Sequence, residues 1–294
     1  MLLGLTVTLG LLLGISTAVA APIWHVTDEA LPTAFQASDG PDNDAYQIQL
    51  ENLGSTASNG TITLIDHLPP GITTSASPEV LPSGTVPFFA CSTGAGQSVV
   101  TCTKEGSLPA TSSFNEAGQE SQTNISLVLP VAVAAGLTGI AKNTVTVEGG
   151  GSTPLTSSTT TPVNAGAPSS FGVSSLSFAE IDSAGEPFAQ AGGHPWALTT
   201  DLSFNHELVP GASDAALKVP QGYRNVSATE EAKTIIAELP LGLIGDPQAA
   251  PRCSQRQFSE AVGDNKSACP ADTRVGVIFP DRTFNTSGAY QVHN

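Results

Sequence analysis

Short runs in which apolar and polar residues alternate recur along the first half of the chain. In the run YQIQLEN, Tyr46, Ile48 and Leu50 fall on one side and polar residues on the other. Because the side chains of a β-strand point alternately to opposite faces, this pattern predicts strands with one buried face. Turn-forming Gly, Asn, Ser and Pro residues separate the runs, which favours antiparallel pairing. The runs cover residues 46–52, 61–66, 124–133 and 143–149.

Residues 91–102 (CSTGAGQSVVTC) have the pattern of a β-hairpin. The central glycines suit its turn, and Cys91 and Cys102 stand where a disulfide would join its two strands. No part of the first half shows a sustained 3.6-residue helical period. We therefore predict an all-β protein whose first domain, residues 21–149, is an Ig-like antiparallel β-sandwich of about seven strands.

Residues 150–168 (GGSTPLTSSTTTPVNAGAP) are dominated by Gly, Ser, Thr and Pro. Leu155 and Val163 are the only large apolar residues in this segment, too few to offset the entropy cost of ordering it. The composition therefore predicts a flexible linker between two domains.

The second half, residues 169–294, alternates again and predicts a second, mostly β domain. One short helix is expected at residues 254–262, because Ser254 suits its first cap and Gly263 its end. The chain stops in strand-like residues, so we expect the molecule to continue beyond Asn294 and this domain to be truncated. The strand-like runs are residues 171–178, 198–204, 234–239 and 275–279.

Residues 1–20 (MLLGLTVTLGLLLGISTAVA) are almost wholly apolar. They end in Ala18, Val19 and Ala20, the small-x-small pattern that precedes signal-peptidase cleavage, although no Lys or Arg precedes the apolar run. The alternative is an uncleaved anchor, since about 20 apolar residues can span a bilayer. The Gly and Thr content and the Ala-Val-Ala end favour a cleaved signal peptide, and hence an extracellular or cell-surface protein with no membrane span after cleavage.

The four cysteines agree with export, because disulfides form in oxidising compartments. Three pairings are possible. Short separations favour Cys91 with Cys102 and Cys253 with Cys269, which places the expected helix inside the second loop. Zinc is the alternative, but neither a Cys-x-x-Cys pair nor a histidine at ligand spacing accompanies these residues.

The chain has 294 residues and a formal net charge of −16, from 26 acidic and 10 basic residues. An acidic surface releases no counterions from nucleic acid and is not attracted to anionic lipid, so neither is an expected partner. The sequence has no Gly-x-Ser-x-Gly elbow, no P-loop and no Gly-x-Gly-x-x-Gly, and HEL at residues 206–208 lacks the second histidine of a zinc protease. We expect no catalysis and no cofactor. An enzyme within these residues is an open alternative, because paired carboxylates cannot be recognised by spacing alone.

One acidic cluster, SDGPDNDAY, is a candidate cation site. Asp39, Asp42 and Asp44 offer the hard oxygen ligands that Ca²⁺ prefers, although Gly40 and Pro41 break the order of an EF-hand. The alternative is a solvated turn before the first strand.

Trp24 and Trp196 are the only tryptophans. We expect Trp196 to fill the end of the second β domain, because large aromatic side chains contribute most when buried. The alternative is an exposed platform on which a polysaccharide could stack.

The phrase Leu-Pro-x-Gly followed by Ile or Leu occurs twice, at residues 68–72 and 239–243. Proline cannot donate to a sheet ladder and glycine permits positive φ, so the phrase closes a strand sharply. We expect Leu68 and Leu239 to be buried anchors, with the residue after each glycine returning to the core.

Four pieces of the first half stand in a recognisable order: YQIQLENLGSTASNGTITLIDHLPPGIT, FFACSTGAGQSVVTCT, ISLVLPVAV and AKNTVTVEGGG. With this order, roughly residues 44–149 resemble the surface-protein conserved-repeat family, the "domain of unknown function eleven". The resemblance implies an immunoglobulin-like sandwich in a secreted or wall-attached protein, and it implies no catalytic residue. His67 departs from the pattern, since a small or hydroxyl residue is more usual there.

The second half, with HPWALTTDLSF, IIAELPLGLIGDPQAAPRCSQRQFSEA and CPADTRVGVIF, resembles a segment of large secreted proteins of high-GC Gram-positive bacteria. That resemblance implies no chemistry. We therefore predict a non-catalytic secreted or cell-surface protein with a structural or adhesive role, whose partner is a cell-wall or extracellular polysaccharide or a surface protein. The alternative is a carbohydrate-binding accessory region of a larger secreted enzyme.

Overall fold

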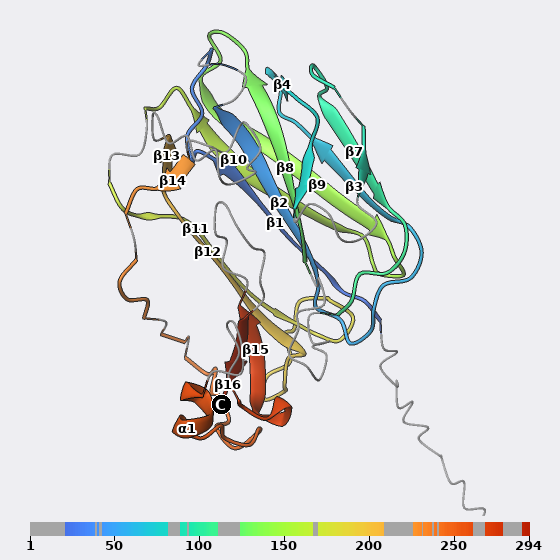
Figure 1. Cartoon of the computed structure of the whole chain (residues 1–294), viewed down its shortest axis with the longest axis vertical. Helices are drawn as coiled ribbons and strands as arrows, with labels where there is room; N and C mark the ends of the chain where they lie inside the picture. The colour runs from blue at the N-terminus through green and yellow to red at the C-terminus, as the bar shows by residue number, and fades with distance from the viewer. Residues whose placement is uncertain are drawn as a thin grey trace, which may run out of the picture.

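A computed structural model shows a β-sandwich formed by the first part of the chain and a smaller set of strands formed by the second (Figure 1). The proposed signal peptide, residues 1–20, lies outside the described residues. No helix in the described part of the chain is long and apolar enough to cross a membrane. The described residues are 21–38, 40, 43–81, 89–92, 94–110, 124–166, 170–208, 226–230, 232–236, 238–239, 241–260, 268–278 and 290–294.

The sandwich consists of two antiparallel sheets of five strands each in the described residues. It therefore has ten described strands where the sequence predicts about seven, because its shortest strands are too brief to show any alternation. The first sheet contains β1 (Trp24–Leu31), β2 (Asp44–Asn52), β8 (Asn124–Val133), β4 (Ile72–Thr74) and β5 (Glu79–Leu81). The second contains, in order, β10 (Leu155–Val163), β9 (Gly139–Gly149), β3 (Ile62–His67), β7 (Val99–Lys104) and β6 (Ala90–Cys91).

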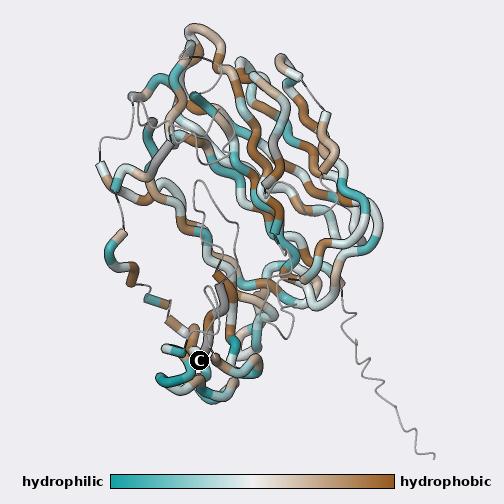
Figure 2. Tube along the Cα trace, viewed as in Figure 1, coloured by the Kyte–Doolittle hydropathy of each residue, from teal (hydrophilic) through white to brown (hydrophobic). Residues whose placement is uncertain are grey.

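The core lies between the two sheets and is filled by the apolar positions of the alternating runs. Tyr46, Ile48 and Leu50 on β2 are all at most 1% exposed, and Figure 2 shows apolar and polar segments alternating along the sandwich strands. Each such side chain contributes roughly 1.5–3 kcal/mol by leaving water. The other face of β2 is covered as well, since Gln47 and Glu51 are each 5% exposed, so this strand has two buried faces rather than the predicted one.

The disulfide-linked hairpin at residues 91–102 is present in the second sheet. Cys91 on β6 stands opposite Cys102 on β7, and the two residues form a disulfide. Gly94 and Gly96 have φ values of 110° and 83° in the connection, a region that side chains other than glycine rarely adopt.

The second half is mostly β, as predicted, and its described residues form three two-stranded antiparallel sheets. The pairs are β11 (Val173–Ile181) with β12 (Ala197–Phe204), β13 (His206–Leu208) with β14 (Val226–Ala228), and β15 (Arg274–Ile278) with β16 (Tyr290–His293). The 3₁₀ helix η2 (Ala271–Thr273) precedes β15.

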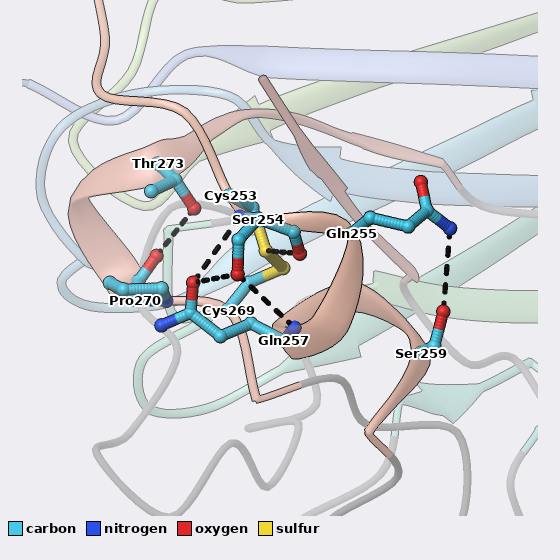
Figure 3. The surroundings of a disulfide bond; sticks show 8 residues. All are labelled: Cys253, Ser254, Gln255, Gln257, Ser259, Cys269, Pro270 and Thr273. Atoms are coloured by element: carbon cyan, nitrogen blue, oxygen red, sulfur yellow. Dashed lines mark hydrogen bonds between the residues drawn. A yellow bond between two sulfur atoms is a disulfide. The ribbon is translucent and has the colours of Figure 1, made fainter.

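The predicted short helix is present as α1 (Gln255–Ser259), and the Cys253–Cys269 disulfide brackets it (Figure 3). Ser254 Oγ accepts a hydrogen bond from Gln257 N, and the Gln257 side chain accepts one from Ser254 N, which is a capping box. Helix α1 ends at Ser259 with Glu260 as its C-cap, and Gly263, the predicted end, lies outside the described residues. No residue of α1 is buried, and short helices depend on packing.

The prediction that residues 150–168 form a flexible linker is wrong over Leu155–Val163, which form strand β10. This strand pairs with β9 along its whole length, from Leu155 opposite Val147 to Val163 opposite Gly139. Composition was misleading because the β-branched Thr residues of this segment suit a strand when a neighbouring strand supplies the hydrogen-bond ladder. Thr161 and Val163 are 0% and 3% exposed, so the end of β10 belongs to the sandwich.

The two Leu-Pro-x-Gly phrases have different roles. The first closes β3 as predicted, with Leu68 and Ile72 buried at 7% and 1% exposure and Gly71 at φ 85°. In the second phrase Gly242 also has positive φ, but Leu239 is 51% exposed, so the expected buried anchor is wrong. The strand predicted at 234–239 is also absent from the described residues of that segment, because no other strand pairs with it.

Candidate functional site: the seam and the hairpin joint

The edges of the two sheets meet along β1 and β10, and they are joined beyond the end of β1, in the connection to β2. Phe35, which follows β1, forms a parallel bridge with Val163, the last residue of β10. Phe35 N donates a hydrogen bond to Pro162 O at 2.9 Å, and Asn164 N donates to Phe35 O at 2.9 Å. We call Phe35, Pro162, Val163 and Asn164 the seam.

At the opposite end of the sandwich, the start of β1 lies beside the chain that leads into β10. A Cβ atom on Gly150 would stand 2.5 Å from Cζ2 of Trp24, closer than any real side chain allows. Glycine at this position therefore permits the tryptophan ring to lie directly on the backbone. With Trp24 near Gly150 at one end and Phe35 bridged to Val163 at the other, β1 and β10 run in the same direction.

Asn164 fastens the seam through its side chain as well as its backbone. Its φ of 56° is in the left-handed region, which asparagine tolerates better than most residues. Asn164 Oδ1 accepts a hydrogen bond from Ala37 N at 2.8 Å, and Asn164 Nδ2 donates to Leu137 O at 2.6 Å. One side chain therefore links the ends of three segments that are far apart in the sequence.

The second half contacts the outer side of the sandwich through the β11–β12 hairpin and β13. Trp196 Nε1 donates to Leu53 O at 3.1 Å, and His206 N donates to Thr33 Oγ1 at 2.8 Å. Thr33 N in turn donates to His206 O at 3.3 Å. We call this set of contacts, together with the ion pair described next, the hairpin joint.

His25 on β1 lies between two carboxylates in the hairpin joint. His25 Nε2 is 2.9 Å from Asp201 Oδ1 on β12 and 3.9 Å from Glu51 Oε2 on β2. Burial acts to lower the pKa of His25, but the hydrogen bond to Asp201 and the charges of both carboxylates raise it above its ordinary value. Burial acts to raise the pKa of Asp201, but hydrogen bonds with His25 and Ser177 and the His25 charge lower it.

We expect the joint to be tightest in mildly acidic solution. The charged form of His25 stabilises docking fully below its ordinary pKa of about 6.5, and this contribution is lost as the pH rises through its raised folded pKa. The contribution of Asp201 is present above about pH 3.9 and is lost as the pH falls through its lowered folded pKa. Hydrogen-exchange protection of the β11–β12 amides should therefore be greatest between about pH 4 and 6.5.

Asp201→Asn should flatten this pH dependence, because it removes the charge that pairs with His25. Glu186→Gln is the matched control, since Glu186 is exposed in the turn of the same hairpin. Equal pH profiles for the wild type and Asp201→Asn would show that the ion pair does not hold the hairpin.

The residues that the sequence singled out for ligand binding are not brought together. Asp39 and Asp42 lie outside the described residues, and Asp44 is a fully buried residue of β2 rather than part of a solvated turn. No group of three or more His, Cys, Asp or Glu side chains in the described part of the chain is arranged to hold a metal ion. The calcium site stays a prediction.

Trp196 does not fill the end of the second β domain as expected, because it is 46% exposed. Its indole N–H donates to Leu53 O in the hairpin joint, and the exposed-platform alternative stays a prediction. The sequence could not show this contact, because the two residues are 143 positions apart.

No protein-family model matches this chain, and no curated protein matches it. Among solved structures, it is similar to the major pilin subunit of Bacillus cereus, with 12% identity and a TM-score of 0.34 over 61% of this chain and 53% of that one. It is also similar to the collagen-binding domain of a Staphylococcus aureus adhesin, with 11% identity and a TM-score of 0.30 over 48% of this chain and 97% of that one. The chain thus spans about half of the pilin subunit, at 53%. Likenesses at these TM-scores carry no information about function.

Sequence reasoning did not identify the seam or the hairpin joint. For His25 and Thr33 the available signal was weak, since both are polar residues near the edge of a strand that shows little alternation. For Asn164 the sequence offers little signal, because the segment that precedes it has the composition of a linker. These sites depend on pairings between distant segments.

Proposed function

We propose that this chain is an extracellular structural module that carries tension along a cell-surface or secreted protein. The observation that supports it is the parallel direction of β1 and β10. The chain enters the sandwich at the start of β1, beside Gly150, and leaves it after the end of β10, beside Phe35. Entry and exit therefore lie at opposite ends of two neighbouring strands that run in the same direction (Figure 1).

This arrangement determines how tension would load the sandwich. A pull on the two ends slides β1 and β10 past each other, so the seam hydrogen bonds and the buried Phe35 side chain resist together. If the first and last strands were antiparallel instead, the points of entry and exit would lie at the same end of the pair. A pull would then separate the hydrogen bonds between the strands one at a time. Resistance to force depends on the unfolding barrier, which is higher when several contacts must break at once.

An extracellular location is supported by the two disulfides, which persist in oxidising compartments. Two sequence features also favour this location: the apolar segment at residues 1–20, and the resemblance of residues 44–149 to conserved repeats of surface proteins. A load-bearing repeat would need rigidity and a long lifetime, and a disulfide-linked sandwich supplies both.

Single-molecule force spectroscopy on the mature chain, residues 21–294, tests this function. In one construction the handles are attached at Ala21 and Ser170, which loads β1 and β10 in the same way as a pull on the whole protein. In the matched control they are attached at Ala21 and Ser55, which separates β1 from β2 at the end where Trp24 pairs with Asn52. We expect a several-fold higher unfolding force in the first geometry.

Equal forces in the two geometries would reject the load-bearing function. Such a result would show that the parallel direction of β1 and β10 has no mechanical consequence, even if the protein is extracellular.

A further inference from the structure

Three polar side chains lie in the sandwich interior where apolar residues would be expected. Asp28 is on β1 in the first sheet, and Asp66 on β3 and Asn143 on β9 are in the second. Asp66 and Asn143 are 0% exposed, and Asp28 Oδ1 is buried. Each residue occupies an inward position of its strand, between apolar neighbours such as Val26 and Val145.

The hydrogen bonds of this group are incomplete when both carboxyls are charged. Asn143 Nδ2 donates to Asp28 Oδ2 at 3.1 Å and so links the first sheet to the second. Four buried oxygens receive no hydrogen bond from a described group: Asp28 Oδ1, both carboxyl oxygens of Asp66, and Asn143 Oδ1. A charged carboxylate only accepts hydrogen bonds, whereas a protonated carboxyl also donates one. Two added protons would therefore supply the donors that these oxygens lack.

No neighbouring charge of opposite sign replaces those protons. Tyr46 and Asp44 of β2 are the other titratable groups of the core around the pair, and Thr161 of β10 donates to Tyr46 Oη at 3.4 Å. Burial, together with the three carboxyls, raises the pKa of Tyr46, so its hydroxyl stays neutral. No cation in the described residues acts on the pKa of Asp28 or Asp66. The cost of burying two negative charges here is avoided most simply by protonation.

The expected titration agrees with this geometry. Burial raises the pKa of Asp28 to about 8, and the Asp66 charge adds to the shift while the Asn143 amide opposes it. Burial raises the pKa of Asp66 to about 7, and the nearby Asn143 amide, whose hydrogen bond of acceptable geometry goes to Asp28, acts in the opposite direction. In the unfolded chain both carboxyls return to about 3.9.

We propose that Asp28, Asn143 and Asp66 form a proton-holding bridge between the two sheets, which fastens β1 in acidic surroundings and loosens it in alkaline ones. Between about pH 4 and 8 the folded chain holds more protons than the unfolded chain, so stability falls as the pH rises through this window. The contribution is fully present below about pH 3.9 and is lost once both folded groups are ionised. The bridge does not depend on the load-bearing function, because its effect is measured in solution without force.

Urea unfolding of the mature chain between about pH 5 and 8 tests the bridge. A Trp196→Phe background leaves Trp24, a buried residue of β1, as the reporter of the sandwich. As the pH rises, Asp28 and Asp66 should each increase the equilibrium constant for unfolding by up to about tenfold per pH unit. Asp28→Asn should remove one such dependence, and Asp28→Asn with Asp66→Asn should remove both.

The comparison with wild type isolates the bridge. Burial raises the pKa of Glu51 to about 7 and its partners raise that of His25, so both groups also lower stability as the pH rises, but equally in every variant. The matched control is Glu148→Gln, an exposed position on the same strand as Asn143, which should leave the pH dependence unchanged. A wild-type stability that rises with pH, or an Asp28→Asn profile equal to that of wild type, would overturn the proposal.

A second measurement needs no variant and so remains decisive if Asp28→Asn does not fold. Carbon NMR of the wild-type chain with labelled aspartate carboxyls should show two carboxyl groups that titrate above about pH 6. If every aspartate titrates below about pH 5, the bridge is absent.

Discussion

Replacing Phe35 with alanine should lower the free energy of unfolding of the sandwich by about 3–5 kcal/mol. Phe35 is 0% exposed, and its ring packs edge-on against Tyr46 with centroids 5.1 Å apart. The substitution removes this buried ring and leaves a cavity between the sheets, while its backbone can still form both seam hydrogen bonds. Urea unfolding followed through Trp24 fluorescence measures the loss.

Phe178→Ala is the matched control for this experiment. Phe178 lies on β11 and is 43% exposed, so removing its ring should change the unfolding of the sandwich by less than about 1 kcal/mol. If Phe35→Ala costs no more than Phe178→Ala, the seam is not part of the stable core. Phe35→Ala should also unfold at lower force when the handles are at Ala21 and Ser170, because the Phe35 ring is one of the contacts that resist the sliding of β1 past β10.

The second large effect is expected from the disulfide of the β6–β7 hairpin. Replacing both Cys91 and Cys102 with alanine should lower the free energy of unfolding by about 3 kcal/mol, because the closed loop restricts the unfolded chain. Cys102 is also 0% exposed in the core, which adds to the loss when its sulfur is removed. The midpoint of urea unfolding, followed through Trp24, measures the change.

The second disulfide provides the internal comparison. Cys253 and Cys269 bracket α1 in the second half, away from the sandwich core, so replacing both with alanine should leave the Trp24 transition unchanged. Equal shifts of that transition for the two double variants would mean that the sandwich and the second half unfold as one unit. No shift for Cys91→Ala with Cys102→Ala would show that pairing within the sheet already fixes the hairpin.

Local patterns in the sequence were enough to predict the class of fold and most strands of the sandwich. The predicted run at 124–133 is strand β8 over the same residues, and the run at 46–52 lies within β2. Ser254 was also predicted as the first cap of the helix, because a cap depends on residues close together in the sequence. The local cysteine pairing is also present in the structure, since each pair is separated by only 11 or 16 positions.

The failures arose where a partner strand, rather than the segment itself, decides the structure. Residues 155–163 have a linker's composition, yet β9 provides a complete ladder for them. Residues 234–239 have a strand's composition, yet no described strand pairs with them, and Ile236 is 82% exposed. A strand exists only when a neighbour satisfies its backbone groups, and the sequence does not specify that neighbour.

By itself, the sequence determined that this chain is a disulfide-containing, acidic β protein with an alternating core, because these properties depend on composition and on residues close together in the chain. Only the tertiary structure decided the parallel direction of β1 and β10, the contact of His25 with Asp201, and the burial of Asp28 beside Asn143. The members of each pair are more than 100 positions apart. Their meeting depends on which strands pair and how the two sheets stack, so no local pattern records it.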